Sequence, residues 1–410
     1  MARVRIYIKP FNPDGTYATD FIEVTKDVLD SSVGRVQRKL DISEYDIGVF
    51  TNSATSFSLR NDHGRYSDVG NINSIFSLKR SDSIVKITWD IANWDFFAGL
   101  SEAGEVQGLE TTLFQGLLSD ESTQMDANDQ KVSFDILGHE TIFSRVLAPD
   151  WVGTPPADNK CSTLLKAAIA AANTGISQPV LTIDNTQIVP SNDIVFDDLT
   201  IFANKTCSEA INKILQVSNS VLYIPTVTPI VSGRAESGSI SWHFFGPGSS
   251  RGAENIIELK NIRPGINRTF NYLSWKDAGL TASNASSQSS YGIRKKEISF
   301  DGVTNSAKRQ SILDALASEF GNPRQEFNLS TPLTYDALAI GLLSQGDIDF
   351  PLIPVDDETL PLYGTAQYGV SIYPKTLSSL QILTSEPYKV LGIDIDAMKN
   401  RIDFKMRRTG

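Results

Sequence analysis

Residues 388–406 read Tyr-Lys-Val-Leu-Gly-Ile-Asp-Ile-Asp-Ala-Met-Lys-Asn-Arg-Ile-Asp-Phe-Lys-Met. Ile402, Phe404 and Met406 alternate with charged residues, and this period of two places one side of a strand against a core. A turn over residues 398–400 separates this strand from the one before it. The stretch therefore predicts a β-hairpin at the C-terminal end of the chain.

The same alternation occurs near the N-terminus, in residues 85–89 and 131–136. Clusters of Asn, Asp, Gly and Ser separate the apolar runs, and residues 61–68 form one such loop. Short strands with turn residues between them favour a barrel or sandwich over a parallel sheet.

Helices are predicted over residues 161–172, 207–218 and 305–320. The second has an apolar stripe at helical spacing and a capping box of Thr206 and Glu209. Pro and Gly residues around 151–159 indicate a boundary before the first helix. The fold class is thus mainly β with a few helices (α+β), in three regions: 1–150, 151–304 and 305–410. The Ser-rich residues 281–290 predict an exposed, mobile loop.

Composition excludes several classes of protein. The chain has 410 residues, a net charge of −11 and 40% hydrophobic residues, which is ordinary for a globular protein. An acidic total argues against tight nucleic-acid binding. No apolar h-region follows the N-terminus and no window approaches 18 apolar residues, so we expect no signal peptide, no membrane segment and folding in the cytoplasm of the producing cell.

An enzyme is not expected. Gly248-Ser249-Ser250-Arg251-Gly252 matches G-x-S-x-G, but a strand pattern follows it instead of a helix, and no histidine lies after Ser250. A flexible hairpin loop is the better interpretation. Acidic pairs such as Asp197-Asp198 are expected to be solvated surface, because a chain with 48 acidic residues forms such pairs by chance.

Cofactor and metal sites are not expected either. Cys161 and Cys207 fall in apolar helix positions and are predicted to be buried free thiols. Two cysteines cannot make a four-cysteine metal site, and the three histidines share no ligand spacing. No phosphate-binding loop, dinucleotide fingerprint or EF-hand pattern occurs.

Residues 28–89 resemble the N-terminal domain of bacteriophage tail-tip and baseplate hub proteins. The residues that carry the resemblance are those at 33–41, 45–50, 59–68, 74–76 and 79–89. Later features follow in the family's order: the helix-then-strands unit at 206–224, Tyr291-Gly292, the helix at 305–320 with Pro323, Gly346-Asp347 and the terminal hairpin. Residues 225–290 have no clear counterpart.

The resemblance implies two β-barrel domains related to tail-tube domains, with a mixed middle region between them. It implies a homotrimeric ring with pseudo-sixfold symmetry at the virion tail tip, assembled in the host cytoplasm. Such a ring connects the distal tail (tube-end) protein ring to a central tip, spike or fibre protein, and DNA passes through it without specific binding. The family supplies no catalytic residues and no cofactor. Because the chain stops at Gly410, directly after the terminal hairpin, we expect no appended enzymatic domain.

Two questions stay open in the sequence. Residues 90–150 hold twelve acidic and two basic residues. Part of this set could face the ring lumen, where like charge repels DNA, or the whole set could coat the outer wall. The preferred lumenal residues flank the strand-like run 111–118 and are Glu102, Glu105, Glu110, Asp120 and Glu121.

The alternative function is a receptor- or carbohydrate-binding tail protein. It would show exposed aromatic residues on loops, and the candidates are Trp94, Trp151 and Trp242. Trp89 and Trp275 lie in strand patterns and are expected in the core. A receptor binder would bind the host envelope and be dispensable for tail assembly, whereas a hub would form rings.

Overall fold

The structure is a computed structural model of the whole chain. It describes residues 3–349 and 388–408, apart from residues 13, 30–31, 41–48, 68–72, 77–80, 91–109, 127–129, 177, 234–241, 246–257, 264, 266–267 and 343.

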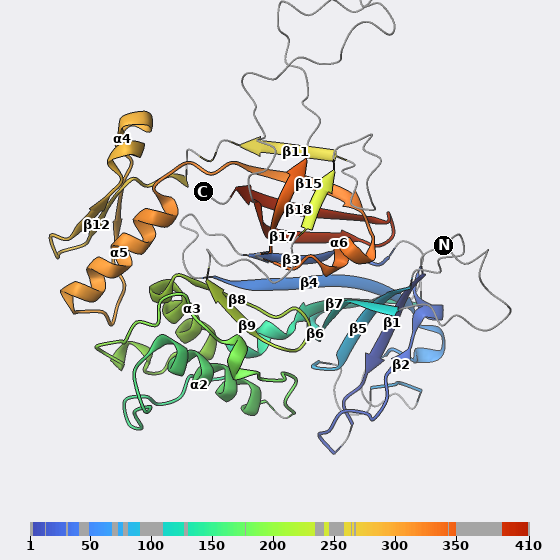
Figure 1. Cartoon of the computed structure of the whole chain (residues 1–410). Helices are drawn as coiled ribbons and strands as arrows, with labels where there is room; N and C mark the ends of the chain where they lie inside the picture. The colour runs from blue at the N-terminus through green and yellow to red at the C-terminus, as the bar shows by residue number, and fades with distance from the viewer. Residues whose placement is uncertain are drawn as a thin grey trace, which may run out of the picture.

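Most described strands belong to one 15-stranded sheet, which crosses the molecule from top to lower right in Figure 1. Along its main path the strands are β2 (Ile22–Glu23), β1 (Arg3–Lys9), β5 (Ile84–Asp90), β6 (Glu110–Asp126), β7 (Lys131–Gly138), β4 (Val49–Arg60), β3 (Val36–Leu40), β17 (Tyr388–Asp396), β18 (Arg401–Arg408), β15 (Glu326–Pro332) and β11 (Glu258–Arg263). All neighbours on this path are antiparallel.

Strands from the two ends of the chain meet in this sheet. β17 pairs with β3, with Ile393 opposite Arg38 and Ile395 opposite Val36. One apolar core extends under both halves, from Ile6 on β1 to Phe404 on β18. The mainly β class and the terminal hairpin are confirmed. The predicted barrels are not closed among the described strands, because β3 pairs with β17 near the C-terminus instead of with another strand of the N-terminal region.

Four further strands branch from the main path. β8 (Ser220–Tyr223) pairs with β4 and β9 (Ile230–Gly233), while β16 (Gln345–Asp349) pairs with β17 and β10 (Trp242–Phe245). The short helical elements of the large sheet's loops are η1 (Thr25–Asp27), η2 (Asp62–Gly64) and α6 (Tyr335–Ala339).

A second core lies in the middle region, below the sheet in Figure 1. Its helices are η3 (His139–Ser144), α2 (Cys161–Thr174), η4 (Asn185–Gln187), η5 (Thr200–Phe202) and α3 (Cys207–Ser218). The predicted capping box at the start of α3 is present, and Asn219 ends the helix in the left-handed conformation. Ile84 of β5 and Leu117 of β6 join this second core, so it packs against the end of the sheet.

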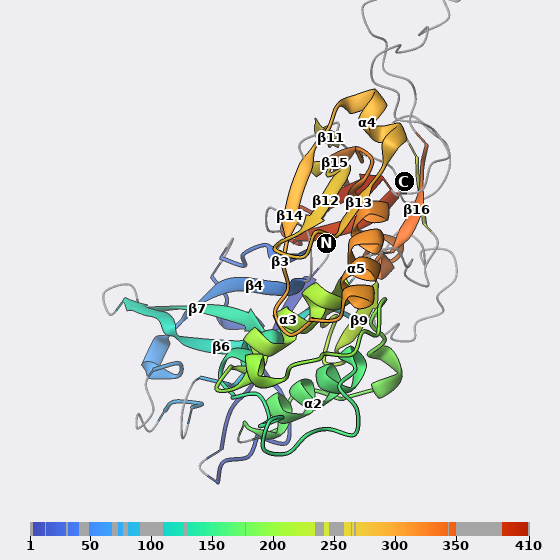
Figure 2. The ribbon, with the colours of Figure 1, turned by 90° about the vertical axis from the view of Figure 1, so that its left-hand side faces the viewer.

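Residues 270–320 form a lobe that we call the arm, and its apolar residues, among them Leu273, Ile312 and Leu316, belong to the second core. It holds a small sheet of β13 (Thr281–Ser283), β12 (Tyr272–Trp275) and β14 (Lys295–Ile298), with α4 (Ala285–Tyr291) and α5 (Ser306–Phe320). Figure 1 shows the arm at the left, and Figure 2 shows α5 alongside β12 and β13. The arm enters after β11 and returns to the sheet through β15.

The expected mobile loop at 281–290 is wrong, because this stretch forms β13 and α4. Asn284 caps the helix by accepting a hydrogen bond from the Ser287 backbone. The Ser289 and Ser290 hydroxyl groups donate to carbonyl oxygens one turn earlier. The cap at Asn284 thus supports a helix that composition disfavours, and the back-bonds satisfy the serine hydroxyl groups without adding to helix stability. The boundaries of the three predicted regions stay a prediction.

Candidate functional site on the polar face of the sheet

On β3, β17, β18 and β15 the large sheet has one apolar and one polar face, whereas on β5 and β6 the side opposite the large core also carries Ile84 and Leu117, which pack into the second core. On β17, Ile393 and Ile395 enter the large core, so Asp394 and Asp396 project from the opposite side. On β3, Val36 lies in the core and the alternate residues Gln37 and Lys39 do not, and neither does Arg35 directly before the strand. We call the side opposite the large core the polar face.

An arginine connects the two ends of the chain on this face. Arg35, directly before β3, lies 3.3 Å from Asp396, 3.8 Å from Asp394 and 3.8 Å from Asp403. Its Nε and Nη1 atoms thus contact carboxylates of both β17 and β18. We call these four residues the Arg35 clasp. It crosses the β3–β17 junction and joins segments far apart in the sequence.

The clasp continues along β18 to β15. The Arg401 Nε atom lies 2.6 Å from Asp403 Oδ1, and its Nη2 atom donates to Ser330 Oγ at 2.6 Å. Burial raises the pKa of Asp394, against the lowering effect of Lys39 and Arg35. One Asp394 oxygen, Oδ1, is buried and has no hydrogen-bond partner among the described residues. Asp394 is therefore the least satisfied carboxylate of the cluster, since a buried acceptor without a hydrogen bond costs free energy.

A row of lysines runs beside Asp394, Asp396 and Asp403, which we call the acidic row. The register places Lys260 of β11 opposite Asn328, Asn328 opposite Lys405, and both Lys405 and Lys39 opposite Gly392. Lys39 and Lys260 are exposed and Lys405 is partly buried. A Cβ atom at Gly392 would lie 3.5 Å from Lys405 Cβ and 3.7 Å from Lys39 Cγ, in ordinary contact. The glycine therefore leaves the two lysine stems with no side chain between them.

Further along the same strands the arm covers the polar face. At the end of α5, the Glu319 carboxylate lies 2.9 Å from Arg324 Nη1 and 3.3 Å from Lys389 Nζ. The Lys389 side chain is 2% exposed and that of Glu319 is 8% exposed. Burial lowers the pKa of Lys389 to about 8, although Glu319 favours its charged form. Glu319 thus attaches the arm to β17.

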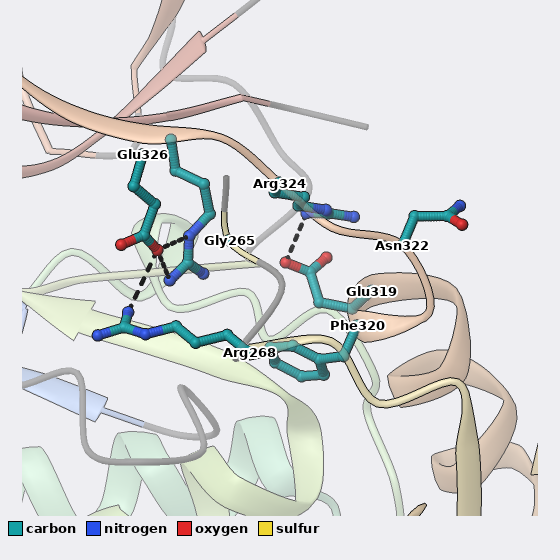
Figure 3. Close-up of a pocket in the computed structure, with 8 residues that line it drawn as sticks. Gly265, Arg268, Glu319, Phe320, Asn322, Arg324 and Glu326 are labelled. Atoms are coloured by element: carbon teal, nitrogen blue, oxygen red, sulfur yellow. Dashed lines mark hydrogen bonds and ion pairs between the residues drawn. The ribbon is translucent and has the colours of Figure 1, made fainter. Parts of the chain in front are cut away.

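A second carboxylate completes this contact region, which Figure 3 shows in close-up. Glu326 of β15 lies 2.6 Å from Arg407 Nη2 and 3.2 Å from Arg268 Nη1. We call Glu319, Lys389, Arg324, Glu326, Arg268 and Arg407 the arm seat. The cavity among them holds about 10 Å³, roughly enough for one water molecule. The arm seat is therefore a packed contact and not a ligand pocket.

The two chain segments that lead into and out of the arm cross at this point. Gly265 has φ +73°, and a Cβ atom there would lie 1.9 Å from the Arg324 carbonyl oxygen. Beyond the crossing, the Phe270 backbone donates to the Phe320 carbonyl at 2.8 Å. Only glycine fits both the positive φ and the close approach.

The other end of α5 is held by the middle region. Asp197 accepts hydrogen bonds from the backbone of Thr304 at 2.8 Å and Asn305 at 2.9 Å, and it pairs with Lys308. Burial opposes ionisation, but the Lys308 and backbone hydrogen bonds outweigh it and lower the Asp197 pKa to about 2. The expectation that Asp197-Asp198 is merely solvated is corrected for Asp197, which fixes the start of α5.

One predicted lumenal residue can be placed with its side chain. Glu110 begins β6, is exposed, and accepts hydrogen bonds from Tyr7 at 2.7 Å and from Thr88. Tyr7 and Thr88 lie on the polar face, so Glu110 does too. Asp120 and Glu121 lie in β6 without described side chains, and Glu102 and Glu105 lie outside the described residues. Their position relative to a lumen stays a prediction.

A buried carboxylic acid was not anticipated from the sequence. Glu140, at the start of η3, is 4% exposed and accepts a hydrogen bond from the Ser53 backbone. Burial raises the Glu140 pKa to about 7, despite the opposing effects of Ser53 and Arg38. The neighbouring His139 is buried as well, and burial lowers its pKa to about 4. This pair lies on η3, which contacts the helices α2 and α3 and the strands β4, β6 and β7.

The remaining sequence predictions are resolved only in part. Cys161 and Cys207 are buried and free, as predicted. Trp89, Trp151 and Trp275 are buried, and Trp151 packs edge-on against Phe202, so Trp151 is not an exposed glycan platform. The side chain of Trp242 is not described, and Trp94 and the segment 248–252 lie outside the described residues.

Over the described part of the chain, no group of three His, Cys, Asp or Glu side chains could hold a metal ion. Across the same ranges, every helix is too short or too polar to cross a bilayer.

No model of a known protein family matches the chain, and no curated protein matches its sequence. Solved structures do match its fold. A tail protein from Neisseria meningitidis MC58 has a TM-score of 0.55 at 10% identity, covering 100% of this chain and 97% of that one. The 43 kDa tail protein of prophage MuSo2 from Shewanella oneidensis has a TM-score of 0.52 at 10% identity, covering 98% of this chain and 97% of that one. The predicted resemblance is confirmed at the level of the fold: this chain has the fold of phage tail proteins over its whole length.

Proposed function

We propose that this chain is a structural protein of a phage tail and acts as a hub ring at the tail tip. It would connect the distal tail protein ring to a central tip or fibre protein and line the path of the DNA. The observation that carries the proposal is the fold, which is shared with two tail proteins over nearly the full length of all three chains.

The contacts of the described residues support a role in a mechanical assembly. The Arg35 clasp fixes the two ends of the chain to each other, and the arm is held at both ends of α5 by Glu319 and Asp197. The cavity in the arm seat is too small for a substrate. These contacts join segments that lie far apart in the sequence, and none of them supplies an activated nucleophile.

The alternative receptor- or carbohydrate-binding role has no comparable support. A glycan binder presents aromatic rings on exposed loops, and Trp151 is 3% exposed. Trp94 lies outside the described residues and the side chain of Trp242 is not described, so these two candidates stay predictions. The hub is proposed ahead of this alternative because of the shared fold with tail proteins.

The test is the copy number and shape of the purified protein, alone and with its tube-end partner. We expect mass photometry to give three copies in the complex and negative-stain images to show a ring with a central opening. A particle that contains one or six copies would contradict the trimeric hub. A particle without a central opening would contradict the role in lining a DNA path.

A further inference from the structure

The end of the arm presents two large apolar side chains to solvent. Tyr291, the last residue of α4, is 45% exposed, and Ile293 is 72% exposed, the highest value for a large apolar side chain among the described residues. The exposed residues around them are polar, among them Ser289, Ser290 and Lys295. Exposed apolar side chains with a polar rim are typical of an interaction site. We call Tyr291, Ile293 and Lys295 the arm tip.

A buried asparagine holds the backbone of the arm tip in place. Asn271 is 0% exposed, and its Nδ2 atom donates to the Gly292 carbonyl oxygen at 2.8 Å. Its Oδ1 atom accepts a hydrogen bond from the Arg294 backbone at 2.7 Å. These two bonds fix the chain on both sides of Ile293. A surface that is ordered before binding loses less conformational entropy when a partner binds, so the arm tip is prepared to make a contact.

The arm tip carries positive charge on an acidic chain. Residues 291–297 contain three cations and one acid, Glu297, whereas the whole chain has a net charge of −11. Lys295 is exposed, and its ammonium lies 5.8 Å from the centre of the Tyr272 ring. Complementary charges steer two surfaces together and fix their register. The partner of the arm tip should therefore offer an apolar side chain beside carboxylates.

One surface segment of the middle region has this composition. Residues 184–195 contain two aspartates and no lysine or arginine. Both aspartates are exposed, and the valine between them, Val189, is 55% exposed. Lys160, which lies opposite the end of this segment, pairs with Asp158 at 3.7 Å. We call Asp184, Val189 and Asp193 the Val189 patch.

The arm tip and the Val189 patch of one chain lie far apart. In Figures 1 and 2 α4 lies at the upper end of the arm, and β9, which η4 contacts just before Val189, lies much lower in both views. The arm is attached to the rest of the chain through Glu319 and Asp197 at the two ends of α5, so its tip is held away from the patch. A contact between tip and patch must therefore join two copies.

We propose that the arm tip of one copy docks on the Val189 patch of a second copy of this chain. The inference rests on the proposed hub function and names the contact that would build its ring. Ile293 packs against Val189, and Lys295 lies beside the aspartates of the patch. Because the two surfaces differ, the contact is head-to-tail, and such contacts close into a ring when the rotation between copies allows it.

The direct test replaces Tyr291 with the photo-reactive residue p-benzoylphenylalanine in the full-length chain. Isotopically light and heavy protein are mixed in equal amounts, irradiated and digested, both alone and in complex with the tube-end partner. We expect cross-linked peptides that join position 291 of one label to residues 184–195 of the other label. Mixed labels identify the link as one between copies.

Sedimentation velocity over a concentration series measures the strength of the contact. Ile293→Ser should weaken self-association roughly 10- to 100-fold, because the variant loses the burial of a large apolar side chain. Val189→Ser should weaken it by a similar factor. The matched control is Met398→Ser: Met398 is 52% exposed at the turn between β17 and β18, away from both surfaces, so association should stay unchanged. Circular dichroism checks that each variant is folded.

A mixture of two variants separates a head-to-tail contact from general damage. When Ile293→Ser and Val189→Ser proteins are combined, one partner supplies an intact tip and the other an intact patch. The mixture should therefore form pairs with the strength of the unchanged protein. It should form no larger assembly, because the second contact of each pair joins two altered surfaces.

Three results would overturn the inference. The first is an absence of cross-links between copies, or cross-links to other segments, and the second is an Ile293→Ser protein that associates as Met398→Ser does. The third is binding of the arm tip to phosphatidylglycerol vesicles without cross-links between copies, which would assign the tip to a lipid surface. The ring test is distinguishable from these. A three-copy ring that Ile293→Ser leaves intact keeps the hub and removes the tip contact, whereas tip-dependent association into pairs or filaments keeps the contact and removes the trimeric hub.

Discussion

Replacing Glu319 with alanine should release the arm from the large sheet. In the arm seat the Glu319 carboxylate lies 3.3 Å from the Lys389 ammonium, whose side chain is only 2% exposed. It also lies 2.9 Å from Arg324. The alanine leaves both cations buried without this carboxylate. Removing one partner of a buried ion pair costs about 3–5 kcal/mol, because the remaining charge is not compensated.

The assay is hydrogen exchange of peptides from α5 and β15, together with urea unfolding. Since every 1.4 kcal/mol is a tenfold change, exchange in these elements should accelerate about 140- to 3700-fold if they open locally. The matched control is Asp301→Ala. That residue pairs with Lys213 at 2.7 Å but its side chain is 68% exposed, and exposed pairs contribute less than about 1 kcal/mol.

A rescue variant separates charge from packing. Glu319→Leu combined with Lys389→Met removes both charges and keeps the volume, so it should be close to the unchanged protein in stability. If Glu319→Ala destabilised the protein no more than Asp301→Ala does, the reasoning about the arm seat would be refuted. The pH dependence is a second readout. Because burial lowers the pKa of Lys389 to about 8, the unfolded chain binds more protons above that pH, and stability should rise between pH 8 and the ordinary lysine pKa.

Three other predictions concern single residues. Asp197→Asn should lower the free energy of unfolding by about 1–2 kcal/mol, after allowance for solvent screening. Because the pKa of Asp197 in the folded protein is lowered to about 2, the unchanged protein should lose this stabilisation as pH falls from 4 to 2. Thermal unfolding of the variant should lack that loss. Glu140→Gln should remove a pH dependence of the opposite sign. Because burial raises the Glu140 pKa to about 7, the stability of the unchanged protein should fall as pH rises from 5 to 7. The melting temperature of the variant should stay level over the same range. Ile214 is 0% exposed, so Ile214→Ala should lower the free energy of unfolding by about 2–5 kcal/mol. A soluble, folded Ile214→Asp protein would show that α3 is misplaced.

Local signals in the sequence predicted local structure well. The residues 207–218 coincide with α3 because the capping box at Thr206 and Glu209 fixes its start and the apolar stripe fixes its buried side. The terminal hairpin was predicted for the same reason, since its alternation of apolar and charged residues is complete within one short segment. The Ser-rich helix α4 was missed because composition alone gives no weight to the cap at Asn284.

Contacts between distant segments could not be predicted in this way. Asp197 lies 107 residues before Thr304, and nothing near Asp197 in the sequence marks it as the cap of a later helix. The arm seat has the same character, because Glu319, Lys389 and Arg268 come from three separate segments. The barrel expectation failed at the same level, since the pairing of β3 with β17 joins strands that no local pattern relates.

The charges of the polar face also determine which pairing the strands adopt. Side chains alternate between the two faces with a period of two, so a slip of β17 by one residue would turn Asp394 and Asp396 into the core and expose Ile393 and Ile395. Burying an ionised carboxylate without a partner costs far more free energy than exposing an isoleucine side chain to water. Arg35 adds to the pairing of β3 with β17 through its contacts with Asp394 and Asp396. Because the Arg35 side chain is 44% exposed, each of these ion pairs contributes less than about 1 kcal/mol, and the alternation of apolar and polar residues along the two strands sets most of the register.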